Sequence, residues 1–165
     1  IPPGIYRKSF AFENWPDFDN ELWQKVCDEE TKGNFNHKII GSDISDIAIR
    51  IATENIKNAS LHRKIELSVS SIEDYKPDTK KPGMVITNPP YGERLKEKDL
   101  EGFYKKLGDT FKTAYPDYNI WILSSNVSAL KSFGLHPSEK LTLYNGPIEC
   151  KFLKYSIYKG SKKQK

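Results

Sequence analysis

The sequence has few cysteines, no long apolar run and no closely spaced pair of glycines. Only Cys27 and Cys150 occur among 165 residues, so neither a disulfide scaffold nor a zinc site of CxxC type is expected. No apolar segment approaches the roughly 20 residues of a membrane span, and residues 1–10 lack the continuous apolar core of a secretory signal. These absences predict a cytoplasmic protein with no membrane partner and no metal.

What the chain does contain is a balanced composition with an uneven distribution of charge. Hydrophobic residues make up 37% and charged residues 29%, which is typical of a globular protein and excludes a disordered one. Residues 1–80 carry a net charge of −3, whereas residues 81–165 carry +7. The basic half favours a polyanionic partner such as nucleic acid, although a solvated lysine-rich surface gives the same count.

Apolar periodicity predicts strands that alternate with helices. This order is typical of an α/β domain with a mainly parallel sheet, and the last two strands follow each other directly, as an antiparallel pair at the sheet edge. We expect one domain with an irregular arm at 1–16 and a basic tail at 160–165. The expected helices are 17–31, 45–59, 100–114 and 126–133, and the expected strands are 38–41, 65–69, 84–87, 120–123, 141–144 and 151–158.

The sharpest motif is Asn88-Pro89-Pro90-Tyr91, directly after a predicted buried strand. Consecutive prolines fix φ and remove two backbone donors, so the strand must end in a rigid elbow at the carboxyl edge of the sheet. The Asn88 side-chain oxygen and the Pro89 carbonyl can accept hydrogen bonds from the amino group of a nucleobase, while Tyr91 stacks on its ring. The alternative is a proline-stopped loop with a tyrosine packed in the core.

A second motif, Gly41-Ser42-Asp43-Ile44, ends the first predicted strand. A carboxylate at this place can accept both hydroxyl protons of a ribose, and the following apolar side chain can cover an adenine ring. The alternative is that Asp43 caps the next helix, which is a common use of aspartate.

The string Asn88-Pro89-Pro90-Tyr91-Gly92-Glu93-Arg94-Leu95 resembles a known family. The first four residues are similar to the motif of S-adenosylmethionine-dependent amino-methyltransferases, and the longer string resembles bacterial 23S rRNA guanine-N2 methyltransferases that carry an RNA-binding THUMP domain. The stretches 3–15 and 145–150 also resemble that family, so the similarity covers essentially the whole chain.

The resemblance implies a Rossmann-like class I methyltransferase sheet, S-adenosylmethionine as cofactor, 23S rRNA as substrate and a THUMP region upstream. It implies a catalytic role for Asn88, Pro89, Pro90 and Tyr91, cofactor binding by Asp43, Ile44, Ser71 and Asn88, and RNA contact by Tyr91 and Arg94. Ser71 departs from the pattern, because the family usually has an acidic residue there to accept the adenine amino hydrogens. Arg94 could equally close its loop through an ion pair.

The family's glycine-rich cofactor loop has no counterpart in this sequence. We therefore expect a partial methyltransferase domain that lacks the first strand, which would lie between the strands 38–41 and 84–87, and lacks the cofactor loop. Other interpretations stay open: an adenine-N6 methyltransferase acting on DNA or RNA, a cofactor-free RNA-binding fragment, or a nucleotide-dependent oxidoreductase that uses Asp43. The absent phosphate loop argues against the oxidoreductase.

Overall fold

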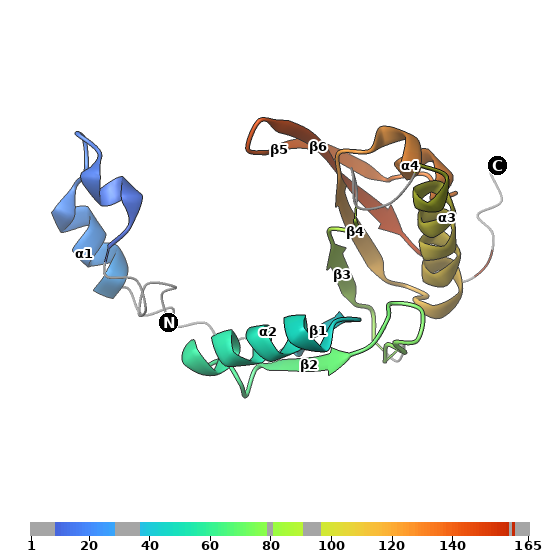
Figure 1. Ribbon diagram of the computed structural model, residues 1–165, viewed down its shortest axis with the longest axis horizontal. Helices are drawn as coiled ribbons and strands as arrows, with labels where there is room; N and C mark the ends of the chain where they lie inside the picture. Colours follow the sequence, from blue (N-terminus) through green and yellow to red (C-terminus); the bar gives the residue numbers. More distant parts are fainter. Residues whose placement is uncertain (1–8, 29–36, 79–80, 91–96, 159, 161–165) are drawn as a thin grey trace. The chain divides into compact units, whose positions relative to one another are not determined.

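The computed structural model describes residues 9–28, 37–78, 81–90, 97–158 and 160 (Figure 1). The chain divides into two compact units, Ile1–Ser71 and Ile72–Lys165. Each unit is described by itself.

The first unit begins with an aromatic cluster around two short helical segments. The 3₁₀ helix η2 spans Ala11–Asn14, and the α-helix α1 spans Asn20–Asp28. Asp19 starts α1 by accepting the amide of Leu22 at 2.9 Å, so the helix begins later than the expected residue 17 because Asp19 is its cap. Ring contacts of 5.1 to 6.4 Å join the aromatic residues Phe10, Phe12, Trp15, Phe18 and Trp23.

The same unit contains a parallel β-α-β element. Strand β1 (Ile39–Asp43) pairs in parallel with β2 (Ile65–Val69), and helix α2 (Asp46–Asn58) connects them. Ser45 caps α2 by accepting the amide of Ala48 at 3.2 Å. β1 runs two residues beyond the predicted end, because Asp43 pairs with Val69 of the neighbouring strand.

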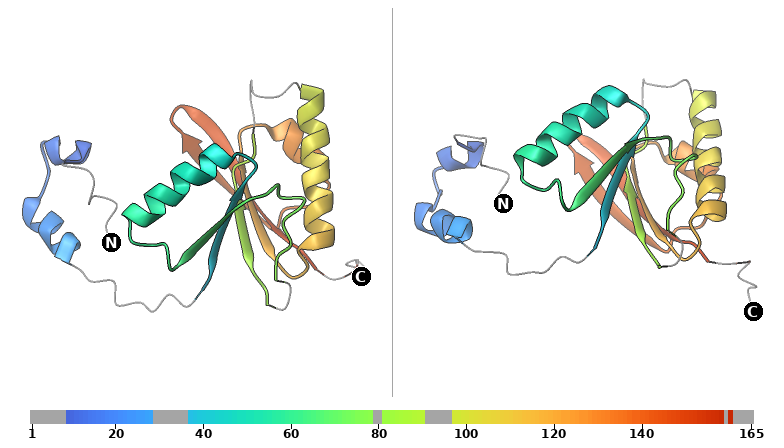
Figure 2. Two further views of the ribbon diagram at one scale, coloured as in Figure 1. Left: turned by 60° about the horizontal axis from the view of Figure 1, so that its bottom comes forward. Right: turned by 90° about the horizontal axis from the view of Figure 1, so that it is seen from below.

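The second unit is a four-stranded sheet with two helices (Figure 2). Its elements are β3 (Met84–Thr87), α3 (Glu97–Ala114), β4 (Asn119–Ser124), α4 (Val127–Ser132), β5 (Glu139–Asn145) and β6 (Ile148–Ser156). The strand order is β3-β4-β6-β5. β3 and β4 are parallel, whereas β6 is antiparallel to both β4 and β5. The predicted α/β class and the antiparallel edge strand are confirmed.

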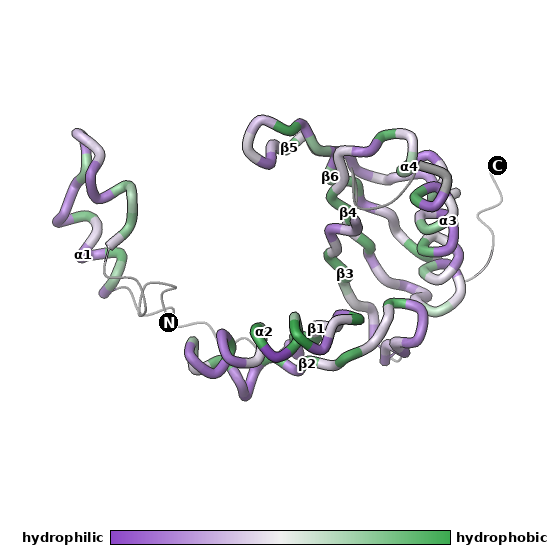
Figure 3. Tube along the Cα trace, viewed as in Figure 1, coloured by the Kyte–Doolittle hydropathy of each residue, from purple (hydrophilic) through white to green (hydrophobic). Residues whose placement is uncertain are grey.

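The core of the second unit lies between one face of its sheet and helices α3 and α4 (Figure 2). Alternate residues of β4 point into it, as the period of a strand requires. α3 contributes apolar residues at steps of three and four, which form one helical stripe. The core residues on these two elements are Leu100, Tyr104, Leu107, Phe111, Ile120 and Ile122. The hydropathy colouring of Figure 3 shows apolar positions on both β3 and β4.

β1 and β3 each have an edge beside which no described strand lies. β1 pairs only with β2, and β3 pairs only with β4, within the described part of the chain. Ile39 and Ile40 of β1, and Met84 and Ile86 of β3, are exposed. These are the two strands between which the sequence predicts an additional strand.

Candidate functional site at the carboxyl ends of the strands

The proline elbow directly follows β3, as the sequence predicts. Thr87, the last residue of β3, pairs with Ile122, so Asn88 follows at the carboxyl end of two parallel strands. Asn88 is exposed, whereas Pro89 is buried. The buried ring anchors the elbow and leaves the amide of Asn88 accessible to a ligand. Tyr91 and Arg94 lie outside the described residues.

A buried pair of hydroxyl groups lies at the end of β4. The Tyr104 hydroxyl of α3 donates to Ser124 Oγ at 2.8 Å, and the amide of Asn126 donates to the same oxygen at 3.1 Å. Asn126 in turn caps α4 by accepting the amide of Ala129 at 2.8 Å. These bonds fix the end of β4 beside the elbow. The sequence analysis missed this pair; its only signal is a serine at the end of an otherwise apolar strand.

Asp43 ends β1 with its carboxylate exposed. Its Oδ1 atom accepts the amide of Ser45 at 2.8 Å, which fixes the turn into α2. The cap of α2 is Ser45, not Asp43, so the alternative role of Asp43 as the helix cap is wrong. The side chain of Ile44 is 77% exposed beside it. The pair thus offers a carboxylate and an apolar surface at one strand end.

The segment after β2 lies next to Asp43. The amide of Ser70 donates to the carbonyl of Asp43 at 3.0 Å, which extends the pairing of β1 and β2 by one step. The Ser70 hydroxyl donates to the carbonyl of Ser71 at 3.1 Å, and Ser71 is half-buried. Asp43, Ile44 and Ser71 therefore share the carboxyl edge of one two-stranded sheet.

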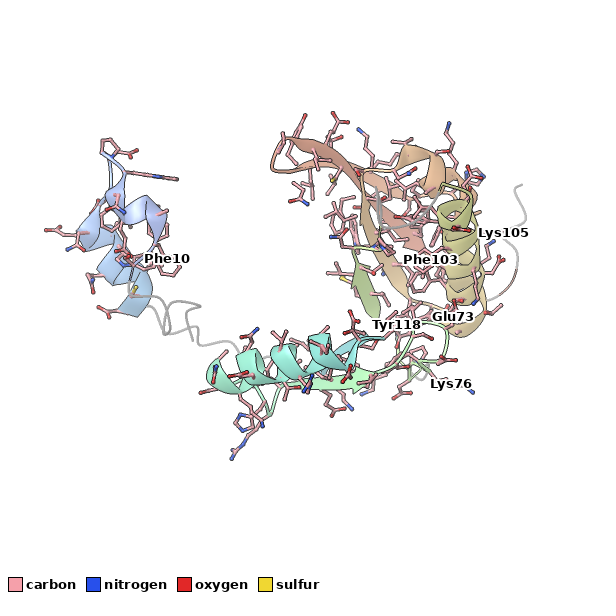
Figure 4. The ribbon with its side chains drawn as sticks, viewed as in Figure 1. Phe10, Glu73, Lys76, Phe103, Lys105 and Tyr118 are labelled. Carbon is pink, nitrogen blue, oxygen red and sulfur yellow. The ribbon has the colours of Figure 1, made fainter. Side chains whose placement is uncertain are left out.

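Helix α3 carries Lys105, Lys106 and Lys112, which could form an RNA-facing patch or a solvated helix face. Lys106 forms an ion pair of 2.6 Å with Glu73, and Lys112 lies 3.4 Å from Asp109. Glu73, Lys105 and Tyr118 are labelled in Figure 4. The hydroxyl of Tyr118 donates to the carbonyl of Asp78 at 3.0 Å. Because Lys106 and Lys112 form these ion pairs, a solvated helix face is favoured over an RNA-facing patch for both lysines.

Burial raises the pKa of tyrosines in the second unit. Burial raises the pKa of both Tyr115 and Tyr155 to about 12, with smaller contributions from neighbouring tyrosines. It also raises the pKa of Tyr118.

No cluster of three or more His, Cys, Asp or Glu side chains among the described residues could hold a metal ion. No described helix is both long and apolar enough to cross a membrane. Cys27 is exposed and Cys150 is buried, and both are free thiols.

Several known proteins are similar to this chain in sequence and in fold. Residues 1–154 match the model of a family described as UPF0020, RMKL-like, methyltransferase domain. The ribosomal RNA large subunit methyltransferase K/L of Shewanella frigidimarina is 37% identical over 98% of the chain, and that of Hahella chejuensis is 36% identical over 96%. The matched regions are 24% and 23% of those proteins.

Solved structures agree with the family match. The structure of SMU.472 complexed with SAH has a TM-score of 0.75 and 29% identity, and the match covers 94% of this chain and 42% of that one. A predicted N6-adenine-specific DNA methylase from Listeria monocytogenes has a TM-score of 0.61 and 29% identity, over 72% of this chain and 30% of that one.

The family match and the similarity to solved structures define a methyltransferase domain of Rossmann-like architecture. The chain belongs to the UPF0020 family, as an RMKL-like methyltransferase domain. It spans about a quarter of the length of the curated relatives that it matches.

Proposed function

We propose that the protein to which this chain belongs transfers a methyl group from S-adenosylmethionine to the N2 amino group of a guanine in 23S rRNA. The observation that supports this most directly is the Asn88–Pro90 elbow at the carboxyl end of β3 in a chain of this family. The names of the relatives support an rRNA substrate. The motif resemblance supports guanine, 23S rRNA and an upstream THUMP region, and the small number of cysteines supports a cytoplasmic location.

In this proposal Asn88 orients the amine of the target base. Its exposed side-chain oxygen accepts one amino hydrogen, and the carbonyl of Pro89 accepts the other. These bonds raise the electron density on the nitrogen and orient its lone pair toward the methyl donor. When the N–C bond forms, the S–C bond breaks, S-adenosylhomocysteine leaves, and one amino hydrogen is released as a proton. Correct orientation supplies several kcal/mol of a barrier of this kind. Tyr91 stacks on the base, and Pro90 keeps the elbow rigid.

The residues of the first unit fit the nucleoside part of the cofactor. Oδ1 of Asp43 is held by the amide of Ser45, which aims the carboxylate so that it can accept the ribose hydroxyls. Ile44 offers an apolar surface of the kind that covers an adenine, and Ser71 or its backbone accepts the adenine amino group. The cofactor supplies the methyl group. Asn88 is the fourth residue that we propose contacts the cofactor.

Adenine methylation is the second candidate. The Asn88–Tyr91 tetrad serves either base, and the Listeria structure described as an N6-adenine-specific DNA methylase is 29% identical to this chain. The extension Gly92–Leu95 and the stretch 145–150 favour guanine in rRNA. Nucleoside analysis of a methylated product separates the candidates, because N2-methylguanosine and N6-methyladenosine differ in mass and retention.

Calorimetry with S-adenosylmethionine tests whether this chain alone keeps a cofactor site. Titrations of the 165-residue chain and of the full-length protein are compared. Binding by the full-length protein supports the proposal. Absence of binding by the full-length protein contradicts it and favours a cofactor-free RNA-binding role.

A further inference from the structure

The β5–β6 hairpin extends past the end of β4. The last pair between β4 and β6 joins Ser124 to Lys151, while the pairs between β5 and β6 continue to Asn145 and Ile148. Residues 143–150 therefore project beyond the strand that they adjoin. Gly146, with φ of +60°, makes the tight reversal. We call residues 143–150 the hairpin tip.

The hairpin tip lies at the same edge of the second unit's sheet as the elbow. β6 is antiparallel to β4, so its amino-terminal end lies at the carboxyl end of β4. β4 is parallel to β3, whose carboxyl end carries Asn88. β5 is three strand spacings from β3, which is about 14 Å. A few nucleotides of single-stranded RNA span this distance.

Tyr144 is the aromatic residue of the hairpin tip, and its side chain is 69% exposed. By the alternation of β5 it shares a face with Lys140 and Thr142, whereas Leu141 and Leu143 share the opposite face. Every residue of β5 is exposed, so the Tyr144 ring contributes little to packing. A tyrosine exposed in this way is a stacking platform for a base.

The face that carries Tyr144 is held rigid and is partly basic. Lys151 Nζ lies 2.6 Å from Glu149 Oε1 and donates to Thr142 Oγ1 at 3.1 Å, which ties β5 to β6 just below the tip. Lys140 is exposed and forms no ion pair with any described residue. Lys140 lies four residues from Tyr144 on the same face of β5, about 13 Å along the strand, so it can contact a phosphate of a neighbouring nucleotide while Tyr144 stacks on a base.

We propose that Tyr144 stacks on a base of the RNA strand that flanks the target nucleotide, so that the hairpin tip is a second RNA contact beside the elbow. This inference rests on the proposed RNA methyltransferase function. The position of the hairpin tip at the substrate edge, together with Lys140 and Lys151 on the face that carries Tyr144, favours RNA over a protein partner.

The test measures Tyr144→Ala, Tyr144→Phe and the control Tyr158→Ala in the full-length protein. Tyr158 is also an exposed tyrosine, at 49%, but it follows the carboxyl end of β6 at the opposite edge of the sheet. Two quantities are measured for each variant with transcribed 23S rRNA as probe. One is the Kd by filter binding, and the other is KM and kcat for methyl transfer from labelled S-adenosylmethionine.

Loss of one base stack weakens binding by about 5- to 100-fold. Tyr144→Ala should raise Kd and KM for the transcript by this factor and leave KM for S-adenosylmethionine unchanged. Tyr144→Phe and Tyr158→Ala should resemble the unmodified protein. An unchanged Kd and KM for Tyr144→Ala would overturn the inference. A lowered melting temperature with unchanged RNA binding would also overturn it, because it would indicate that the Tyr144 ring packs within the protein.

Different results would contradict the proposed function and the proposed hairpin contact. If the unmodified protein binds the transcript but transfers no methyl group, the proposed function is wrong, while a raised Kd for Tyr144→Ala still supports the hairpin contact. If methyl transfer occurs and Tyr144→Ala leaves KM for RNA unchanged, the hairpin contact is wrong and the proposed function stands.

Discussion

The hydroxyl of Tyr104 in α3 donates a 2.8 Å hydrogen bond to Ser124 Oγ, at the last residue of β4. Both side chains are fully buried. The same serine oxygen accepts the amide of Asn126, which caps α4. One oxygen thus links α3, β4 and α4 at the edge where Asn88 is presented.

Removing either hydroxyl should destabilise the second unit. Tyr104→Phe and Ser124→Ala should each lower the free energy of unfolding by about 1–2 kcal/mol, because a buried polar partner loses its hydrogen bond. Urea denaturation measures this loss, and Tyr158→Phe is an exposed control. The double variant should cost less than the sum of the two single variants. Additive costs would contradict a direct bond.

Two glycines of α3 should respond to alanine in opposite ways. A Cβ at Gly108 would collide with the backbone carbonyl of Phe133, whereas a Cβ at Gly102 would meet nothing. Gly108→Ala should cost about 2–4 kcal/mol because α3 must move away from α4. Gly102→Ala should stabilise by up to about 1 kcal/mol through helix propensity. Equal unfolding midpoints for the two variants would contradict the described packing of α3 on α4.

Asp43→Ala should weaken binding of S-adenosylmethionine by the full-length protein. Loss of charge-assisted hydrogen bonds to a ribose corresponds to about 10- to 100-fold in Kd. Asp46→Ala is the matched control, because Asp46 is an exposed carboxylate in the first turn of α2, 4.0 Å from Arg50. Calorimetry measures both variants. Equal affinities would remove Asp43 from the cofactor site.

Stability should fall at high pH through the buried tyrosines. The pKa of Tyr115 and of Tyr155 is about 12 in the folded state, against an ordinary value of 10.0. The folded state therefore holds these protons more tightly, and stability is full below pH 10 and declines between pH 10 and 12. The loss should be about 1–3 kcal/mol in total.

Denaturation at several pH values, with tyrosinate absorbance followed in parallel, measures this decline. Tyr115→Phe is an informative variant, because the Tyr115 hydroxyl is buried with no hydrogen-bond partner among the described residues. It should leave stability near neutral pH almost unchanged and make the decline shallower. An ordinary titration of every tyrosine near pH 10 would contradict the prediction.

Local signals in the sequence predicted the strand ends that carry the motifs. The bounds of β2 (Ile65–Val69) and β3 (Met84–Thr87) agree with the prediction, because apolar runs there are stopped by polar residues and by prolines. β1 and β5 are longer than predicted. Their extra residues are strands only because a neighbouring strand pairs with them, and such pairing depends on residues distant in the sequence.

The contrast between local sequence signals and contacts of distant residues also explains which parts of the site the sequence predicts. The sequence places Asn88 and Asp43 at strand ends because each follows a strand in a recognisable motif, and their roles in the site stay predictions. The contact of Tyr104 with Ser124 was missed because it depends on how α3 is rotated over the sheet, which spacing alone does not fix. The exposure of Tyr144 was missed for a similar reason, since it follows from the length by which β5 and β6 pass β4.

Asn88 carries the central claim, and one measurement in cells tests it most directly. A strain that lacks the gene is complemented with the full-length protein, with Asn88→Ala, or with Asn55→Ala as an exposed asparagine of α2. Nucleosides of its 23S rRNA are then quantified by mass spectrometry. We predict that N2-methylguanosine is restored by the unmodified protein and by Asn55→Ala but not by Asn88→Ala, which should still bind S-adenosylmethionine. Normal N2-methylguanosine with Asn88→Ala, or restoration of N6-methyladenosine instead, would contradict the account.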